Sequence, residues 1–311
     1  MLTTFVIPVY QNELTVKKTY TEIVSYMKKY DSKVLLEFIF VNDGSTDNSL
    51  NEIKCLCEEF ENVSYLSFSR NFGQVAALIA GYKRSKGDIV INLSADLQDP
   101  VFIIGKLIDK YRKGFQIAIA YREKRNDDFI SSIFSKVFYS LLKLSNNNMP
   151  VGGFDFTLMS RKALIEFNKI NERNRFFQGD ILWLGFDPVF IGYERVKREF
   201  GKSQWTFSKK IKYFIDGLLN STYLIIRSII IFGLFLSVSS FTFGLFTILQ
   251  YFVFDSQVTG WTSIIVIITL MGGVTILMLG LIGEYIWRVY DETRGRSLYV
   301  IDEESNIKIG K

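Results

Sequence analysis

Two long apolar stretches near the C-terminal end constrain the fold of this chain most. Residues 228–254 carry no charge, and residues 262–287 carry only Glu284, close to the end of the stretch. Each exceeds the roughly 20 residues that a helix needs to cross a bilayer. We therefore predict a transmembrane hairpin over 223–290, in which Glu284 pairs with Arg288 one turn further on. A buried helical hairpin in a soluble protein is the alternative.

The charges around these stretches predict the orientation of the hairpin. The connecting loop, DSQVTG over 255–260, carries no Lys or Arg. The flanks carry these cationic residues: Lys202, Lys209, Lys210, Lys212, Arg227, Arg288, Arg294 and Arg296. Because cationic residues stay on the cytoplasmic side, both termini are expected in the cytoplasm and the loop outside. Residues 291–311 then form a cytoplasmic tail.

The segment just ahead of the hairpin predicts a helix at the membrane interface. Over 201–222, Trp205, Phe207 and further apolar side chains approximate one helical face, with Lys side chains elsewhere. Such a helix suits a bilayer surface, and packing against a folded domain is the alternative. The net charge of +5 likewise favours a lipid bilayer or phosphate-bearing partners over nucleic acid.

Residues 1–200 predict one cytoplasmic α/β domain. Strand and helix patterns alternate over the first 120 residues, which indicates a doubly wound, Rossmann-like, mostly parallel sheet, and the pattern after 128 is α+β. Strands are expected at 3–9, 36–42, 63–68, 88–93, 115–121, 154–160 and 188–198. Helices are expected at 13–30, 46–60, 73–85, 100–112, 129–144 and within 160–183.

Three polar segments, 8–10, 42–45 and 94–96, directly follow predicted strands. In parallel sheets ligands bind beyond the carboxyl ends of the strands, so these segments should meet at one edge. Asp43 can accept hydrogen bonds from a base or a ribose. A turn that caps the next helix is the alternative interpretation of VNDGSTD.

The segment SADLQDP, 94–100, is a candidate metal site. Hard divalent cations prefer oxygen ligands and are often held by one or two carboxylates together with substrate phosphates. Asp96, with the Gln98 amide nearby, can supply such a site. For Asp99, a helix cap and a metal ligand are equally good interpretations. Ser94 offers a neutral hydroxyl, which suits ribose or bound water better than a cation.

The absent side chains narrow the chemistry. There is no His, and both cysteines lie in Cys55-Leu56-Cys57 on a predicted helix. This argues against a zinc site and fits a reduced cytosolic setting. Acid–base chemistry must then fall to carboxylates, Lys or Tyr. The N-terminal segment MLTTFVIPVY lacks the features of a signal peptide and predicts a first strand.

Taken in order, four segments resemble the family 2 glycosyltransferases with a GT-A fold: PVYQNE, VNDGSTD, SRNFGQVAALIAGYKRSKGD and SADLQDP. Later segments narrow the resemblance to the membrane-anchored polyprenyl-phosphate branch: YREKR, GGFDFTLMSRKAL, GKSQW and GLIGEYIWRVYDETRGRSLYVI. That branch includes the bactoprenol glucosyltransferases, with dolichol-phosphate mannose synthases as relatives. The resemblance covers essentially the whole chain.

The resemblance implies an inverting transfer of one hexose from a nucleotide diphosphate sugar to a polyprenyl phosphate, with Mg²⁺ or Mn²⁺ as cofactor. Glucose, UDP-glucose and undecaprenyl phosphate are the default sugar, donor and acceptor. The product would be a lipid-linked sugar for cell-envelope glycan modification. The implied setting is a bacterial inner membrane, with multi-pass anchoring and a homo-oligomeric assembly.

The resemblance also assigns site residues by position. Asp155 matches the carboxylate proposed as base, and Asp96 with Gln98 would hold the metal. The nucleotide pocket would be lined by Pro8, Tyr10, Glu13, Asp43 and Ser94. Arg122 and Arg125 would lie near phosphates. A loop that closes on the donor, or receives the lipid phosphate, would include Arg198, Lys202 and Ser203. Because a phosphate monoester has a second pKa near 6, Asp155 can orient the acceptor instead of removing a proton. The alternative interpretation of Asp155 is a structural carboxylate at a strand end that is buried and hydrogen-bonded to the backbone.

Two other functions are weighed against this one. A processive polysaccharide synthase would carry a QxxRW motif and more spans, whereas Gln178 is followed by GDIL. A non-catalytic membrane scaffold, or a translocation partner, needs no acidic and basic cluster at the strand ends. The sequence departs from the family pattern at Asn42, Ser94 and Gln204, and the last removes a charge near the expected phosphate.

Overall fold

The computed structural model describes residues 1–96, 98–123, 150, 153–194 and 260–305, with scattered helical residues between 231 and 249. The chain divides into two compact units, Met1–Ser221 with Ser297–Lys311, and Thr222–Arg296. The expected helices at 129–144 and 201–222 lie outside the described residues, as does much of the first apolar stretch.

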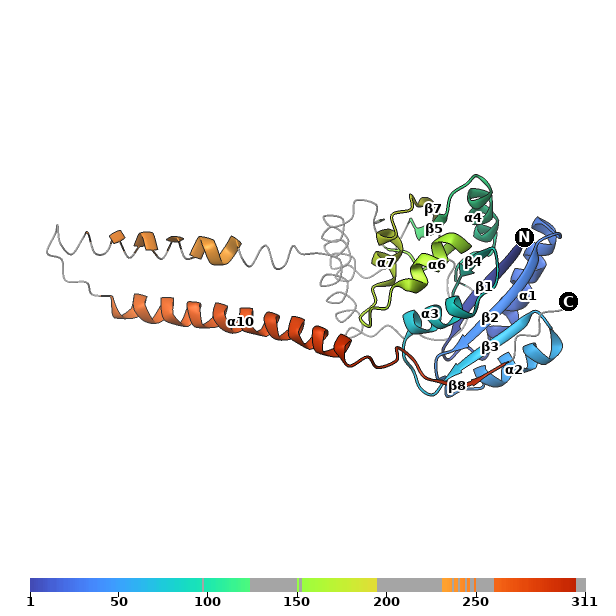
Figure 1. Cartoon of the computed structure of the whole chain (residues 1–311), viewed down its shortest axis with the longest axis horizontal. Coiled ribbons are helices and arrows are strands. Elements are labelled where there is room, and N and C mark those ends of the chain that lie inside the picture. The colour runs from blue at the N-terminus through green and yellow to red at the C-terminus, as the bar shows by residue number, and fades with distance from the viewer. Residues whose placement is uncertain are drawn as a thin grey trace. The chain divides into compact units, whose positions relative to one another are not determined.

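A mostly parallel sheet organises the first unit (Figure 1). Its strands are β1 (Leu2–Val9), β2 (Leu35–Asn42), β3 (Val63–Phe68), β4 (Ile89–Asn92), β5 (Ile117–Arg122), β6 (Phe156–Ser160), β7 (Val189–Tyr193) and β8 (Ile301–Glu304). Their order is β7-β5-β6-β4-β1-β2-β3-β8. Strands β6 and β8 run antiparallel to their neighbours, and the others share one direction. The predicted α/β fold class is confirmed.

Helices cover both faces of this sheet. They are α1 (Val16–Tyr30), α2 (Ser49–Glu59), α3 (Gln74–Arg84), α4 (Phe102–Arg112), α6 (Arg161–Lys169) and α7 (Phe177–Trp183). Because both faces are covered, the central strands read as nearly continuous apolar runs, which is why the sequence located them within about two residues. The helices expected within 160–183 are α6 and α7.

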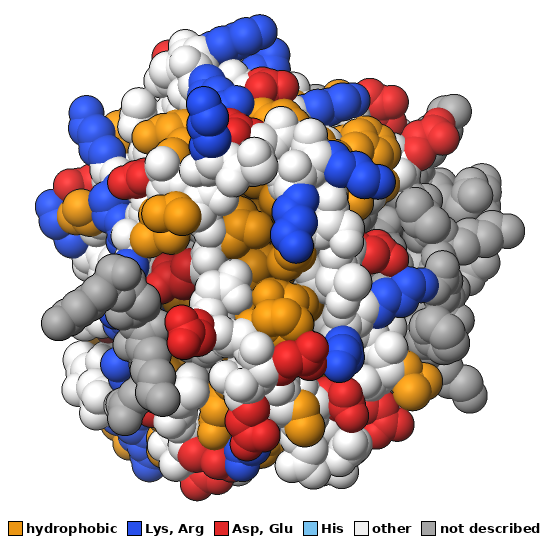
Figure 2. Space-filling model, turned by 90° about the vertical axis from the view of Figure 1, so that its right-hand side faces the viewer, with side chains coloured by type: hydrophobic (Ala, Val, Ile, Leu, Met, Phe, Trp, Pro, Cys, Tyr) orange, Lys and Arg blue, Asp and Glu red, His pale blue; other side chains and the backbone are white. Residues whose placement is uncertain are grey.

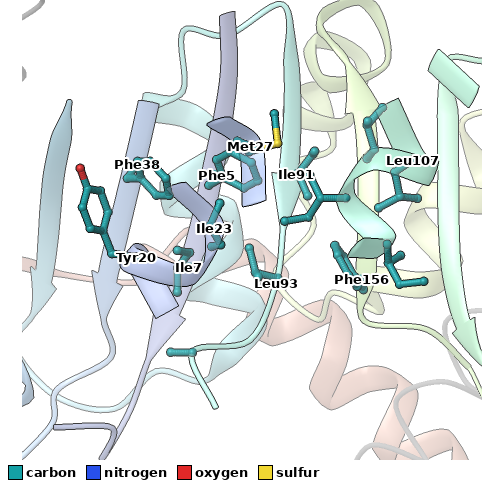
Figure 3. Close-up of a cluster of buried hydrophobic side chains, with 14 of the residues drawn as sticks. Phe5, Ile7, Tyr20, Ile23, Met27, Phe38, Ile91, Leu93, Leu107 and Phe156 are labelled. Atoms are coloured by element: carbon teal, nitrogen blue, oxygen red, sulfur yellow. The ribbon is translucent and has the colours of Figure 1, made fainter. Parts of the chain in front are cut away.

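Buried aromatic and aliphatic side chains fill the space between the sheet and α1, α2 and α4 (Figure 3). Phe5 stacks on Phe38 with ring centroids 5.1 Å apart, and Tyr20 of α1 meets Phe38 edge-on at 4.8 Å. Each fully buried side chain of this size contributes about 1.5–3 kcal/mol relative to exposure. On the other face, Phe167 of α6 meets Tyr82 of α3 and Phe177 of α7 at 5.6 and 6.0 Å.

The order of the strands reverses between β1 and β4, and this fixes where a ligand can bind. The chain leaves β1 toward β2 and β3 on one side and returns to β4 on the other side of β1. Diverging loops at such a switch point open a crevice at the carboxyl ends of the strands. In register, Val9 lies beside Asn42, and Val6 lies beside Asn92. The three polar segments predicted to converge therefore do so.

Strand β8 corrects the expectation that residues 291–311 form a separate tail. It pairs antiparallel with β3, with Leu66 opposite Glu304. Tyr299 stacks on Phe68 at 5.0 Å, and Lys54 lies 2.7 Å from the Glu303 carboxylate. The domain predicted over 1–200 thus lacks its last strand. Sequence reasoning missed this strand because it is short, charged and far along the chain from its partner.

The described part of the second unit contains one long helix, α10 (Trp261–Thr293). Within the described residues, Leu270–Thr293 is long and apolar enough to cross a membrane. At 1.5 Å per residue, the 33 residues of α10 extend about 50 Å, more than a hydrocarbon core of about 30 Å. The expected pair is confirmed, since Arg288 Nε lies 3.1 Å from the Glu284 carboxylate. The first span of the hairpin stays a prediction.

The surface of the first unit shown in Figure 2 carries both charge signs. Lys and Arg side chains are interspersed with Asp and Glu across that face. Exposed pairs in the unit include Lys17 with Glu59 at 3.1 Å and Arg112 with Asp31 at 2.5 Å. Such exposed pairs contribute little to stability, typically 0–1 kcal/mol. They are typical of a solvated surface.

The contact between β8 and α2 predicts the reactivity of Cys57. The thiol is hydrogen-bonded to Ser305, and burial raises its pKa to about 12. In a Cys55→Ser background, truncation after Arg296 removes β8 and should make Cys57 react with a maleimide at least about tenfold faster, because the thiol becomes solvated and its pKa falls. Mass spectrometry of the labelled protein measures this.

Truncation after Ser305 is the matched control, because it keeps β8 and the Ser305 contact. It should leave Cys57 as slow as in the full chain. Equal labelling of Cys57 in both truncated proteins would contradict the placement of β8.

Candidate functional site

The loops after β1 and β2 interlock at the carboxyl edge of the sheet. The backbone N–H groups of residues 11–13 donate to the side chains of Ser45, Ser49 and Asp47 at 3.2, 2.8 and 3.3 Å. In return, the Glu13 carboxylate accepts from the backbone of Asn48 at 2.9 Å. The structure therefore gives Glu13 a clear role in joining two loops, and its contact with a nucleotide stays a prediction.

Pro8 and Tyr10 lie at the end of β1 beside these loops, and both are half-buried. The backbone N–H of Tyr10 donates to Asn12 Oδ1 at 3.1 Å, which shapes the exit from the strand. Gln11 adopts φ 57°, a left-handed conformation that is uncommon for residues other than glycine. Its amide donates to Thr46 at 2.8 Å, so this strained turn is held from the neighbouring loop.

Asp43 binds the loop that precedes α3. Its carboxylate accepts from the backbone N–H groups of Phe72 at 2.7 Å and Gly73 at 2.9 Å, and its exposed fraction is 3%. The negative charge therefore lies at the positive end of the α3 dipole. Gly44 has φ 65°, and a Cβ there would lie 2.3 Å from the Arg70 carbonyl carbon. This glycine allows the two loops to touch.

The loop after β4 carries the candidate metal ligands. Asp96 is 8% exposed and accepts from the backbone N–H of Gln98 at 3.3 Å. The Thr19 hydroxyl of α1 donates to the Ala95 carbonyl at 3.2 Å and so connects this loop to the helix. Ser94 is half-buried. Among the described residues no group of three or more His, Cys, Asp or Glu side chains could form a protein-only metal cage.

Arg122 lies at the centre of a second group, formed where β5, β6 and β7 meet. Its guanidinium lies 3.3 Å from the Asp155 carboxylate. Because β6 runs antiparallel, the start of that strand lies at the same edge as the ends of β4, β5 and β7. Asp155, just before β6, is therefore brought to Arg122 at the end of β5. Two residues proposed as catalytic are thus brought together.

Tyr193 and Asp99 complete this group. The Tyr193 hydroxyl donates to Asp99 Oδ1 at 2.5 Å and is hydrogen-bonded to Arg122, its neighbour across β5 and β7. Burial first, and the charge of Asp99 next, raise the pKa of Tyr193, so the hydroxyl stays protonated. This buried contact with Tyr193 is a third role for Asp99, and the helix cap and the metal ligand both stay predictions.

The electrostatics keep Arg122 cationic. Burial alone would lower its pKa, but the negative charges of Asp155 and Asp99 outweigh burial and raise the pKa above its ordinary value. Its side chain is 17% exposed, whereas that of Asp155 is 46% exposed. A cation that is partly buried and fixed by the Asp155 carboxylate and the Tyr193 hydroxyl is suited to meet a phosphate.

Sequence reasoning missed Tyr193, because a tyrosine at the end of an edge strand carries no motif. Four predicted site residues, Arg125, Arg198, Lys202 and Ser203, lie outside the described residues. A cavity of about 410 Å³ lies at the opposite end of the strands, between the end of α3 and β8. No predicted site residue lines it, so it does not belong to this group.

Comparison with known proteins identifies the family of this chain. The model for Glycosyl transferase family 2 matches residues 4–167, a range that spans Asp43, Asp96, Arg122 and Asp155. The chain belongs to this family. The predicted membership is confirmed, and the chain is a glycosyltransferase.

Relatives resemble this glycosyltransferase along nearly its whole length. The glycosyltransferase CsbB of Bacillus subtilis (strain 168) is 36% identical over 309 residues, which cover 98% of this chain and 92% of that one. The bactoprenol glucosyl transferase of Shigella phage SfV is 33% identical over 308 residues, which cover 98% and 99%. Among solved structures, glucosyl-3-phosphoglycerate synthase from Mycobacterium tuberculosis with UDP gives a TM-score of 0.49 at 16% identity, covering 70% of this chain and 80% of that one.

The contact between Gly44 and the Arg70 backbone predicts a position-specific loss of stability in this glycosyltransferase. Gly44→Ala adds both a strained positive φ and a backbone clash, so the free energy of unfolding should fall on the order of 2 kcal/mol further than in the control below. Thermal melting of the detergent-purified protein measures the difference.

The control is Gly114→Ala. Gly114 has φ 99°, and a Cβ there would meet nothing within 4 Å. The substitution therefore adds backbone strain without a clash. If both variants lowered the melting temperature equally, the close approach of the two loops would be wrong.

Proposed function

We propose that this glycosyltransferase transfers a single glucose from UDP-glucose to undecaprenyl phosphate, with inversion, at the cytoplasmic face of a bacterial inner membrane. The observation that carries the proposal is the position of Arg122, held between Asp155 and the Asp99–Tyr193 pair at the carboxyl edge of the sheet. Similarity to bactoprenol glucosyl transferases over nearly the full length supports the sugar and the lipid acceptor.

The metal site would be sparse. Asp96 offers a largely buried carboxylate at the switch point, and Gln98 follows it on the same loop. Their oxygens fit Mg²⁺ or Mn²⁺ held together with donor phosphates, because these ions need only one or two protein carboxylates. Such an ion neutralises charge that develops on the leaving diphosphate. Ser94, half-buried beside it, would hydrogen-bond the ribose or a bound water.

The nucleotide would lie across the loops after β1 and β2. Pro8 and Tyr10 would border it on the β1 side, and Asp43 with Glu13 would shape its floor through the backbone contacts described above. The site would thus be largely preformed, because the loops fix one another without a ligand. A preformed pocket lowers the entropic cost of binding, because fewer loops and side chains must become ordered when the ligand binds.

The acceptor phosphate would meet Arg122. An oxygen of the phosphate attacks the anomeric carbon from the side opposite the diphosphate, and Asp155 orients the acceptor or removes its proton. Arg122 supplies a fixed positive charge and needs no reorganisation during the reaction. Arg125, together with Arg198, Lys202 and Ser203, would contribute further contacts with phosphates.

Membrane attachment would concentrate the lipid acceptor near the site. Within the described residues, α10 is long and apolar enough to span a bilayer. A second span over 228–254, an interfacial helix over 201–222, cytoplasmic termini and a homo-oligomer complete the proposed arrangement. Confinement of enzyme and acceptor to one surface raises their effective concentration, as linkage does for tethered binding modules.

The proposed function predicts metal-dependent transfer of labelled glucose into lipid. The full-length protein, incubated with UDP-[¹⁴C]glucose and undecaprenyl phosphate, should move label into the organic phase, and EDTA should stop this. Asp96→Ala should lower the rate at least about 100-fold, because it removes the carboxylate that holds the ion. Scintillation counting of the extracted phase measures the rate, with other nucleotide sugars tested in parallel.

Ser94→Ala is the matched control on the same loop. It removes a neutral hydroxyl and should weaken transfer by no more than about tenfold, since one neutral hydrogen bond contributes about 0.5–1.5 kcal/mol. Equal loss in the two variants would overturn the division of roles between Ser94 and Asp96. Absence of label from the lipid phase with every donor would refute the function itself.

The role of Asp155 predicts a pH-dependent defect. If Asp155 removes a proton from the acceptor, Asp155→Asn should be most defective below pH 6, where the phosphate monoester is protonated. The variant should recover as pH rises and the acceptor becomes a dianion. Rates measured between pH 5.5 and 8.5 test this, with Ser94→Ala as the reference profile. A loss that is constant across pH would instead assign Asp155 to orientation alone.

A further inference from the structure

Asn92, the last residue of β4, makes buried contacts that no sequence motif predicts. Its side chain is 1% exposed. Its amide nitrogen donates to the backbone carbonyl of Asp155, and its amide oxygen accepts from Tyr82 at 2.9 Å and from Thr157 at 2.5 Å. All the hydrogen bonds of this amide therefore connect β4 to α3 and to the segment that carries Asp155.

The chemistry of the partners fixes which way this amide points. The Asp155 carbonyl can only accept, so it must face the nitrogen of Asn92. The two hydroxyls can donate to the oxygen on the other side. An apolar side chain or a carboxylate at this position could not satisfy the same set of partners, and a buried polar group without a partner costs about 1–3 kcal/mol.

The contact lies where the backbone ladder between β4 and β6 stops. Asn92 and Thr157 form the last aligned pair, and the next residue, Leu93, donates its N–H to Val6 of β1. Beyond that pair, no strand hydrogen bond of β4 holds the chain around Asp155. At this point the Asn92 side chain, instead of the backbone, connects the two elements, because it donates to the carbonyl of Asp155.

A second buried amide holds the same segment from α7. Gln178, 3% exposed, donates to the Phe154 carbonyl at 2.8 Å. The helix that carries Gln178 is itself fixed by a buried ion pair, in which Arg175 Nε lies 2.5 Å from the Asp180 carboxylate. The carbonyls of Phe154 and Asp155 are thus held by side chains from two different elements.

We propose that Asn92 is a positioning residue for Asp155, and that it couples the loop of Asp96 to the residue that faces the acceptor. The inference rests on the proposed function and deepens it. The proposed role of Asn92 involves no contact with substrate. It fixes the backbone from which the half-exposed Asp155 carboxylate reaches Arg122, while β4 continues from Asn92 directly into Ser94 and Asp96.

The consequence is a specific kinetic defect. Displacement of a reacting group by about 1 Å can lower a rate about 100-fold. Asn92→Leu keeps a similar volume but has no hydrogen bonds, so kcat should fall about 10- to 100-fold, whereas the KM for UDP-glucose should change less than about threefold. Asp43, in a loop proposed to bind the donor, is hydrogen-bonded to the backbone of Phe72 and Gly73 and not to Asn92.

The experiment is a double-mutant cycle in the full-length enzyme. Transfer is measured for the wild type, Asn92→Leu, Asp155→Asn and the double variant. A residue that acts through Asp155 should have little further effect once that carboxylate is gone, because effects of coupled residues are not additive. Gln178→Leu, tested in the same two backgrounds, is a second variant in case Asn92→Leu does not fold.

A matched control separates positioning from general loss of stability. Ser64→Ala removes a buried hydrogen bond, from Ser64 to the Phe38 carbonyl at 3.1 Å, in the same sheet but away from the site. It should lower the melting temperature and leave kcat within about twofold. An equal fold-loss from Asn92→Leu in both the wild-type and the Asp155→Asn backgrounds would overturn the inference. Wild-type enzyme without transfer activity would instead refute the proposed function.

Discussion

The pairing of β1 with β4 is the constraint on which the candidate site depends. It places Val6 beside Asn92 and so brings the loop of Asp96 next to the loop after β1. The order of the strands reverses at this pairing, and neighbouring loops therefore diverge and leave room for a ligand. A slip of one residue in this register would turn Asn92 to the other face of the sheet.

Buried polar side chains at the ends of the central strands stabilise the carboxyl edge of the sheet. They form hydrogen bonds with groups that the strand ladders do not pair. Asn42 donates to Ser67 and accepts from the backbone of Ser45, Asp43 accepts from two backbone groups, and Asn92 satisfies three partners. Burial of such groups is costly unless they are hydrogen-bonded. Here the contacts of Asn42 with Ser45, of Asp43 with residues 72 and 73, and of Asn92 with Asp155 also fix loops, so the same bonds that meet this requirement hold the site in place.

The central strands and the three converging polar segments could be predicted from sequence, because apolar runs covered on both faces and strand-end polar residues are local signals. Strand β8 and the contact of Tyr193 with Asp99 could not, because both depend on residues far apart in the chain. The prediction for Asp155 located the residue but not its setting. Only the antiparallel direction of β6 explains how its carboxylate comes to Arg122.

The chain connects the second unit to the sheet domain twice. The first unit comprises Met1–Ser221 and Ser297–Lys311, so the segment between them is tied to the sheet domain at both ends. The second tie is β8, held by strand pairing and by the ion pairs of Glu303 with Lys54 and Glu304 with Arg84. A domain attached at one end can sample more orientations than one attached at two, because each closed connection removes chain entropy. Double attachment therefore restricts the sheet domain more than a single connection would, and β8 carries the second connection.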